Sequence, residues 1–232
     1  MIQIQPFAAL GQFQNEWLNA RHHFSFGSYH DDARMGVGAL RVWNDDEIAP
    51  GRGFDPHPHR DMEIVTYVRE GAITHRDSLG NEGRTEAGDV QVMHAGSGIT
   101  HGEVNKESTA TRLFQIWIVP AKRGVTPGWA TRSFPKDAEG LVALADGRPM
   151  ADGTALSLHA DAAVLAATLT PGQSVTHHLA PGRVAYVVPS TGTVTINGTT
   201  VATRDGATIT DEAKITITAS QPAEIVLVDV LA

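Results

Sequence analysis

The sequence is rich in histidine: 11 of its 232 residues are of this type, against three tyrosines. Five of them fall within a window of 45 residues, at His57, His59, His75, His94 and His101. Imidazole is the commonest metal ligand in proteins, and the pKa of histidine lies close to neutral pH. We therefore expect the chemistry of this protein in this window, as metal binding or as acid–base catalysis.

Two short patterns in the window have the spacing of residues that share one face of a strand. His57-Pro58-His59 places two imidazoles two residues apart, and His101-Gly102-Glu103 repeats that spacing with a carboxylate. Alternate residues of a strand point to the same side of the sheet. If the two segments lie side by side, three imidazoles and at least one carboxylate converge. Such a nitrogen and oxygen donor set suits Fe, Mn, Ni, Cu or Zn.

Glu63 is another candidate for the carboxylate, because it follows His59 by four residues and keeps the same face in a regular strand. A single His-x-His pair is weak evidence, since surface histidines that bind no metal often have this spacing. The second pair with a matched face makes a metal site the favoured interpretation. Glycines at Gly51, Gly53 and Gly96 precede the two pairs and allow the backbone to turn sharply there.

The elements that position these residues are predicted to be short β-strands, because Gly and Pro divide the chain into apolar pieces rich in Val, Ile and Thr. Strands are expected at Val37–Trp43, Glu63–Arg69, Ala72–Arg76, Val90–Met93, Arg112–Val119, Val164–Leu169, Val184–Val188, Thr193–Ile196, Lys214–Thr218 and Glu224–Val230. Hairpins are indicated at Asn197-Gly198 and Leu79–Gly83, and short helices at Gln12–Asn19 and Lys136–Leu144. The pattern predicts an all-β sandwich or barrel.

A loose internal repeat divides the chain. Glycines follow His57 after 14 and 31 residues, and they follow His177 after 15 and 29 residues. An offset of about 120 residues indicates two copies of one β-barrel unit. We expect a first barrel over residues 1–120, a linking region over 121–153 and a second barrel over 154–232.

Composition narrows the classes of protein. Hydrophobic residues make up 41% of the chain, enough for a packed core, and the net charge of −8 disfavours binding nucleic acid through a basic face. No apolar run approaches the roughly 18–20 residues of a membrane span, and the N-terminus lacks the pattern of a secretory signal. With no cysteine, thiolate ligands and cysteine nucleophiles are excluded. These features predict a cytoplasmic protein without a nucleic-acid or membrane partner.

Longer motifs around these residues resemble known families. The patterns from Gly51 to Gly71 and from Gly88 to Asn105 are similar to the two cupin motifs, although His94 replaces the usual proline. A closer resemblance, to the pirin family, is carried by His23–Phe26, Leu40–Asp46, Pro56–Gly71, Met93–Glu103 and Phe114–Ile118. The second half of the chain matches only in its β-rich character.

The resemblance implies a bicupin, two jelly-roll β-barrels in one chain, with a metal in the first barrel only. Carried over by position, the metal ligands are His57, His59, His101 and Glu103. Glu63 is then expected to lie next to the ligands without binding the metal itself. The implied metal is iron, as Fe(II), with Zn, Ni, Mn or Cu as alternatives. No second metal centre is expected, because His177 and His178 are adjacent and point to opposite faces of a strand.

Resemblance to bacterial members of the family implies quercetin 2,3-dioxygenase activity, in which O2 opens the ring of a flavonol and carbon monoxide is released. Glu103 would be the catalytic base that takes the 3-hydroxyl proton, or simply a ligand. Eukaryotic relatives imply an alternative, a metal-containing regulatory protein that binds a protein partner and turns nothing over. A third alternative is a cupin isomerase or hydrolase, which needs no oxygen.

The other polar and aromatic residues of the first half are interpreted as structural. We expect His75 and His94 at the rim or on the surface, and His22–Phe26 packed near the barrel mouth. We expect Asn44–Glu47 to form a solvated turn, and Phe114 and Trp117 to lie in the core.

Overall fold

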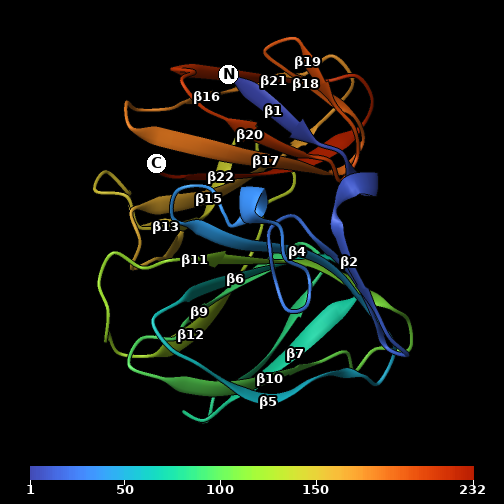
Figure 1. The fold of residues 1–232 in the computed structure, drawn as a ribbon, viewed down its shortest axis with the longest axis vertical. Coiled ribbons are helices and arrows are strands. Elements are labelled where there is room, and N and C mark those ends of the chain that lie inside the picture. The colour runs from blue at the N-terminus through green and yellow to red at the C-terminus, as the bar shows by residue number, and fades with distance from the viewer.

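The computed structural model describes residues 1–232 and is built almost entirely of strands, with two short 3-10 turns, η1 (Phe7–Ala9) and η2 (Asp32–Arg34). The strands form two similar units, and each unit combines a seven-stranded sheet with a four-stranded sheet. This is the all-β, two-barrel bicupin fold that the sequence predicted (Figure 1). No helix of the protein has the length and apolar character needed to cross a membrane.

The first unit contains the histidine-rich window. Its large antiparallel sheet has the order β12-β9-β6-β11-β4-β3-β2 and its small sheet the order β5-β10-β7-β8. The strands of this unit are β2 (Gly11–Gln14), β3 (Leu18–His22), β4 (Leu40–Ile48), β5 (Gly53–His59), β6 (Glu63–Glu70), β7 (Ala72–Asp77), β8 (Glu82–Glu86), β9 (Asp89–His94), β10 (Ile99–Val104), β11 (Thr111–Ile118) and β12 (Gly128–Ser133).

The second unit repeats this arrangement, with a large sheet in the order β1-β20-β17-β22-β15-β13-β14 and a small sheet in the order β16-β21-β18-β19. Its strands are β1 (Ile2–Gln5), β13 (Val142–Asp146), β14 (Leu156–Ser157), β15 (Ala162–Leu169), β16 (Ser174–His178), β17 (Arg183–Thr191), β18 (Val194–Ile196), β19 (Thr199–Val201), β20 (Gly206–Ile209), β21 (Lys214–Ala219) and β22 (Ala223–Leu231). The N-terminal strand β1 therefore belongs to the second unit, where it pairs with β20. The segment 121–153, expected as a link, contributes β12 to the first unit and β13 to the second.

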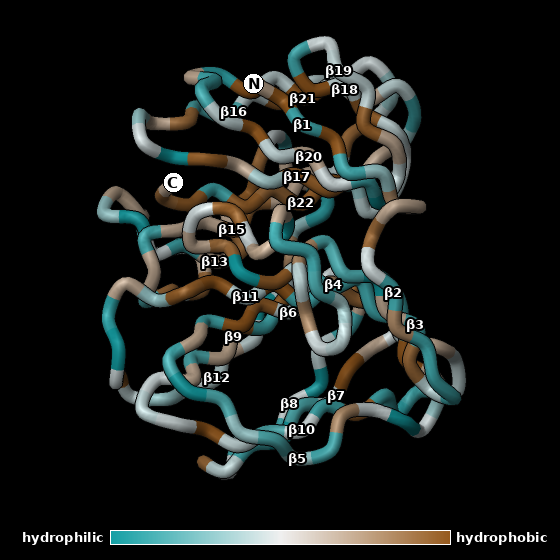
Figure 2. The backbone as a smooth tube through the Cα atoms, viewed as in Figure 1, coloured by the Kyte–Doolittle hydropathy of each residue, from teal (hydrophilic) through white to brown (hydrophobic).

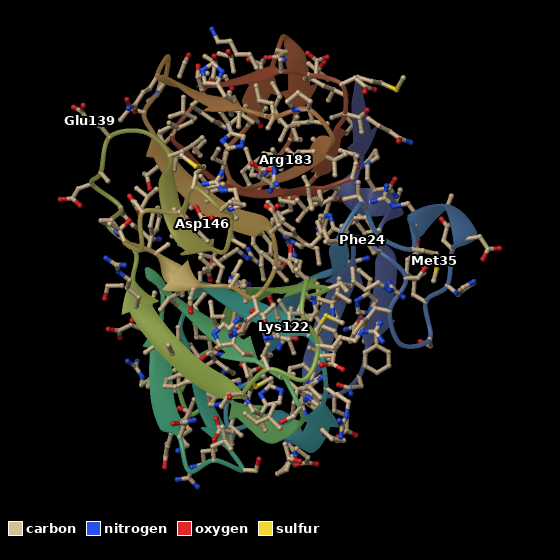
Figure 3. The ribbon with its side chains drawn as sticks, turned by 90° about the vertical axis from the view of Figure 1, so that its left-hand side faces the viewer. Phe24, Met35, Lys122, Glu139, Asp146 and Arg183 are labelled. Atoms are coloured by element: carbon tan, nitrogen blue, oxygen red, sulfur yellow. The ribbon has the colours of Figure 1, made fainter.

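The two large sheets pack against each other in the middle of the molecule, with the small sheets outside them (Figure 1). A cluster of 24 buried residues fills the junction, drawn from β4, β6 and β11 on one side and from β15, β17 and β22 on the other. Phe24, a member of this cluster, lies at the level where the two units meet (Figure 3). The central strands are buried on both faces, which explains their nearly continuous apolar sequences.

The interiors of the two barrels differ in character. The second barrel encloses a cluster of 19 buried apolar residues, whereas the apolar clusters of the first barrel contain only 6 and 4 residues. In Figure 2 the strands β5 and β10, which cover the first barrel on its outer side, are largely hydrophilic. Polar side chains therefore occupy much of the interior of the first barrel, and a functional site is expected there.

The prediction of two short helices is wrong, because neither segment is helical in the structure. Residues 12–19 form the hairpin of β2 and β3, whose turn is closed by Asn15 Oδ1 accepting hydrogen bonds from the backbone N–H groups of Trp17 and Leu18. Residues 136–144 form a turn followed by the start of β13. In both cases pairing with a neighbouring strand outweighs the local preference.

The expected solvated turn at Asn44–Glu47 is also wrong. These residues lie inside β4, and Asn44, Asp45 and Asp46 are at most 3% exposed. The carboxylate of Asp45 accepts hydrogen bonds from Arg69 and from Arg204 of the second unit. Paired charges can be buried in this way, and Asp45 thereby ties the two barrels together.

Candidate metal centre

Strands β5 and β10 bring three histidines together. They pair antiparallel, with His101 opposite His57 and Ile99 opposite His59. The ring centroids of His57, His59 and His101 are 4.6–5.0 Å apart, and each ring offers a nitrogen within 4.8 Å of the others. The spacing expected from the sequence thus gathers all three imidazoles at one point, which we call the histidine triad.

Hydrogen bonds leave the triad with free nitrogen lone pairs. His57 Nδ1 lies 2.7 Å from the backbone oxygen of Asp55, so it carries the proton and donates, and His57 Nε2 is left as an acceptor. The Nε2 atoms of His59 and His101 are buried and have no hydrogen-bond partner in the protein. Metal-ligating histidines characteristically donate their other ring N–H to an oxygen of the protein, as His57 does.

Two members of the triad are neutral at neutral pH. Burial, followed by the charge of His57, lowers the pKa of His59 to about 4. Burial, together with the neighbouring histidines, lowers the pKa of His101 to about 3. Neutral imidazole is the form that binds a metal ion.

Glu103 is wholly inside the barrel. Its two carboxylate oxygens accept hydrogen bonds from the side-chain amides of Gln91 and Gln115. Burial raises the pKa of Glu103 to about 7, although hydrogen bonds from Gln91, Gln115 and Thr66 oppose this shift. No lysine or arginine forms an ion pair with Glu103, so a bound cation would be the counter-charge that this carboxylate lacks.

Glu103 lies on the side of the triad that His101 occupies. It shares a group of ligand atoms within 4.8 Å with His101 and His75, whereas His57 and His59 group with His101 alone. His101 is therefore the shared member of both groups. Strand β10 pairs with β7 in unbroken register from His101 to Val104, and the irregularity lies in β5, where the three steps from His57 to Phe54 face the two steps from His101 to Glu103. Because β10 is regular, His101 and Glu103 point to the same side of the sheet.

The residues present fit a divalent transition metal. Its bonds to imidazole nitrogen and carboxylate oxygen are about 2.0–2.2 Å long, which holds ligand atoms up to about 4.4 Å apart. The triad approaches this spacing, and its buried nitrogens without partners and the uncompensated carboxylate are what such an ion would satisfy. The imidazole-rich donor set argues against Ca or Mg, which take oxygen ligands.

A row of polar side chains on the large sheet faces this group. Strand register places one residue from each of six neighbouring strands side by side: His22, Asn44, Gln115, Thr66, Gln91 and Thr131. Within the row, His22 Nδ1 and Asn44 Oδ1 are 2.8 Å apart, and Gln91 donates to Thr66 Oγ1 at 3.3 Å. Thr66 thus helps to orient Gln91, and Trp117 Nε1 donates to Gln115 Oε1 at 3.2 Å, so both amides are held in the orientation in which they bind Glu103.

A cavity of about 390 Å³ opens beside the triad. Its walls combine apolar and polar side chains: Phe13, Leu18, Ala20, Phe26, Phe54 and Trp117, with His22, Asn44, Asp46, Gln115, His57 and His59. An apolar cleft with a few convergent polar groups is the usual form of a small-molecule site, and this volume lies at the lower end of the usual range. The cavity therefore has the composition of a small-molecule binding site.

Two interpretations from the sequence are corrected by these positions. His75 is not at the rim but fully buried: its ring stacks on Trp129, and its Nε2 lies 2.9 Å from Asp77 Oδ2. Trp117 is only half-buried and lines the cavity, where its ring meets His59 edge-on at 4.9 Å, although Phe114 is in the core as expected.

Glu63 is directed elsewhere, because the chain turns between β5 and β6 at Asp61, whose φ is +49°. The carboxylate of Glu63 accepts hydrogen bonds from His94 Nδ1 at 2.6 Å and from the backbone N–H of His159 at 2.9 Å. Glu63 and the half-buried His94 thus form a contact between the two units.

Sequence reasoning missed the glutamines and the threonine that hold Glu103. Each lies in the middle of an apolar strand, as in Val65-Thr66-Tyr67, Val90-Gln91-Val92 and Phe114-Gln115-Ile116. A single polar residue at an inward-facing strand position is the available signal, because a buried amide needs a partner. In the second unit, His177 is paired with Asp229 at 2.9 Å, and His178 is exposed.

Comparison with known proteins gives matches over both units. The model of the pirin family matches residues 4–118, and that of the quercetinase C-terminal cupin domain matches residues 146–230. A pirin-like protein of Caulobacter vibrioides is 58% identical over 231 residues, which cover 99% of each chain. A quercetin 2,3-dioxygenase of Escherichia coli is 42% identical, covering 99% of this chain and 98% of the relative.

A solved structure has the same fold over the whole chain. The bacterial pirin YhhW of Escherichia coli, in complex with nickel(II), superimposes with a TM-score of 0.94 at 40% identity, and the match covers 100% of this chain and 99% of that one. The resemblance seen in the sequence motifs is confirmed by these matches. The chain belongs to the pirin family.

Proposed function

We propose that this protein is a metal-dependent dioxygenase that cleaves a flavonol such as quercetin with O2 and releases carbon monoxide. The observation that carries the proposal is the histidine triad: three ring nitrogens gathered beside a cavity that His57 and His59 line, with the ring nitrogens of His59 and His101 buried without any partner in the protein. The name of the Escherichia coli relative, quercetin 2,3-dioxygenase, supports the substrate class.

In this proposal His57, His59 and His101 hold one divalent ion, and Glu103 completes the set from the side of His101. The ion is proposed to be Fe(II), with Ni, Zn, Mn or Cu as alternatives, and the related structure that contains nickel(II) supports a divalent transition metal. When bound, such an ion supplies Lewis acidity, which lowers the pKa of a coordinated hydroxyl group.

Glu103 is proposed as the catalytic residue that accepts the proton of the flavonol 3-hydroxyl group. Its raised pKa of about 7 suits a general base at neutral pH. Gln91 and Gln115 hold the ionised carboxylate through their amide N–H groups, and this fixes its orientation. Trp117, Phe26 and Phe54 form the apolar surfaces against which the flavonol rings pack.

The experiment is a flavonol assay on the purified protein in air, with metal analysis of the same sample. We expect loss of flavonol absorbance together with release of carbon monoxide, and loss of both in the double variant His57→Ala, His59→Ala. Stoichiometric metal with no flavonol consumed would refute the dioxygenase and favour the regulatory alternative. Turnover that persists without O2 would favour an isomerase or hydrolase instead.

A further inference from the structure

Two adjacent carboxylates of β4 have opposite surroundings. Asp45 accepts hydrogen bonds from Arg69 and Arg204, and it lies at the junction of the two units. Asp46 is equally buried, at 2% exposure, but its Oδ1 atom has no hydrogen-bond partner in the protein. Because successive residues of a strand point to opposite faces, Asp46 is directed into the first barrel, where it lines the cavity.

The other polar groups of the cavity wall are already occupied. His22 and Asn44 bind each other, and Gln115 donates to Glu103. Besides Asp46, the only cavity-lining side chain with a fully buried, unpartnered polar atom is His59, which belongs to the triad. Asp46 is therefore the polar group on this wall that neither the protein nor the proposed metal accounts for.

A buried carboxyl group without a partner is unfavourable for folding. Burial, and after it the charges of Asp45 and Glu103, raises the pKa of Asp46 well above its usual range, with Arg69 acting in the opposite direction. A protonated carboxyl group both donates and accepts a hydrogen bond, which is the capacity that a ligand hydroxyl group can match. A feature that weakens the fold and faces a cavity is characteristic of a binding site.

We propose that Asp46 determines specificity by hydrogen-bonding a hydroxyl group of a polyhydroxylated aromatic ligand in this cavity. The inference rests on the proposed function, and it adds that the site recognises a hydroxyl substituent of the ligand through Asp46. A site with a polar group built for a substrate hydroxyl discriminates strongly against the analogue that lacks it, because the buried group is then left unpaired. Asp46 and the triad come from opposite sheets, so they contact the ligand from two sides.

The test is equilibrium binding to the metal-containing protein without O2, so that nothing is turned over. The probes are flavonols that differ from one parent by the removal of a single ring hydroxyl group. For one of these removals we expect the wild type to bind the parent about tenfold more tightly, or better. In Asp46→Leu that preference is expected to fall below about twofold, while Asp46→Asn, which can donate and accept, retains most of it.

Thermal unfolding separates this role from a structural one. Asp46→Leu is expected to raise the melting temperature, because it removes a buried polar group without a partner, whereas Asp46→Asn keeps a buried polar group there and is expected to leave the melting temperature close to that of the wild type. Metal content is expected to stay unchanged in both variants. The matched control is Asp45→Asn on the same strand, which breaks two ion pairs and is expected to lower the melting temperature.

Two results would overturn the inference alone. One is an unchanged preference across the flavonol series in Asp46→Leu, and the other is a fall in melting temperature for Asp46→Asn as large as that of Asp45→Asn. If the wild type binds no flavonol at all, the proposed function fails and this inference fails with it.

Discussion

The Nδ1 atoms of His75 and His101 lie 3.4 Å apart inside the first barrel. One of the two nitrogens must carry the proton for the contact to be a hydrogen bond. His75 Nε2 lies 2.9 Å from Asp77 Oδ2 and donates to it, so neutral His75 accepts at Nδ1 and His101 donates. The hydrogen bonds from His101 to His75 and from His75 to Asp77 therefore leave His101 Nε2 with a free lone pair.

Removing this support is expected to weaken metal binding. In His75→Phe the ring stacking is kept, but His101 loses its acceptor, and metal affinity is expected to fall by about 10–100-fold. Competition with a chelator of known affinity measures the change. The matched control is Asp55→Asn: His57 donates to the backbone oxygen of Asp55, so this variant should bind metal as the wild type does. Equal affinities in all three proteins would contradict the tautomer assignment.

Substitution of Glu103 distinguishes a base from a ligand. Glu103→Gln is expected to lower kcat by about 10²–10⁴-fold while retaining most of the metal, because the triad remains intact. Metal analysis and turnover should be measured on one preparation. Losses of metal and of activity in equal proportion would assign Glu103 to the ligands only.

Glu63→Gln is the matched control for that experiment. It changes another buried glutamate of the first unit, one that binds His94 and the backbone of His159. We expect unchanged metal content and a loss of stability, because the contact between the units is weakened.

The close approach of β5 to β10 depends on Gly53. A Cβ atom at this position would lie 2.0 Å from the backbone oxygen of Glu103. Gly53→Ala should therefore displace β5, separate His57 from His101 and reduce metal binding severely. Gly51→Ala is the comparison: its φ of +69° implies strain, but a Cβ atom there meets nothing within 4 Å. We expect it to lose about 1–2 kcal/mol of stability and to keep its metal.

The second unit supplies a prediction on pH. Burial alone would raise the pKa of Asp229, but hydrogen bonds from His177 and Arg183 outweigh it and lower the pKa below the usual value of 3.8. Because the folded-state pKa is the lower one, the stabilisation is complete above the unfolded-state pKa and is lost as the pH falls through the folded-state pKa. Asp229→Asn breaks the buried ion pairs with Arg183 and His177, although Arg183 keeps its bond to Asp161, and it should cost about 3 kcal/mol at pH 7.

Urea unfolding from pH 7 down to pH 2 checks this expectation. The difference between the wild type and Asp229→Asn should shrink below about pH 4, where the carboxylate becomes protonated. Glu82→Gln, at an exposed pair with Arg76, is the control and should leave stability unchanged within the error of the measurement at any pH. A constant difference across the range would show that Asp229 does not stabilise the fold through its charge.

The strands were predictable because their signals are local. The expected strand Glu63–Arg69 is observed as β6 (Glu63–Glu70), and the hairpin at Asn197-Gly198 has φ values of +45° and +85°, as this dipeptide favours. The two pairs His57/His59 and His101/Glu103 were recognised by the same kind of local signal, spacing and alternation. Their convergence was expected only on the condition that the two segments lie side by side, and the full ligand set was implied by the family resemblance.

The errors concern residues whose partners are distant in sequence. Asp45 resembles a turn residue until Arg204, 159 residues away, is placed beside it. His75 has no marked local pattern, and its role depends on Asp77 and on the register that brings β7 next to β10. The expected helix at residues 12–19 failed in part for the same reason: besides the local hairpin of β2 and β3, the segment is extended because β3 pairs with β4, which is distant in sequence.

The uneven filling of the two barrels has a consequence for dissecting this protein. The apolar interior of the second barrel and the junction cluster of 24 residues are where hydrophobic burial is concentrated, while the first barrel encloses a cavity and the amides of Gln91 and Gln115. A fragment ending after β12 would leave its half of the junction exposed to solvent, and the second half expressed alone would lack its edge strand β1. Each half therefore depends on the other to bury its apolar face, and we expect that neither half expressed alone forms a stable folded unit.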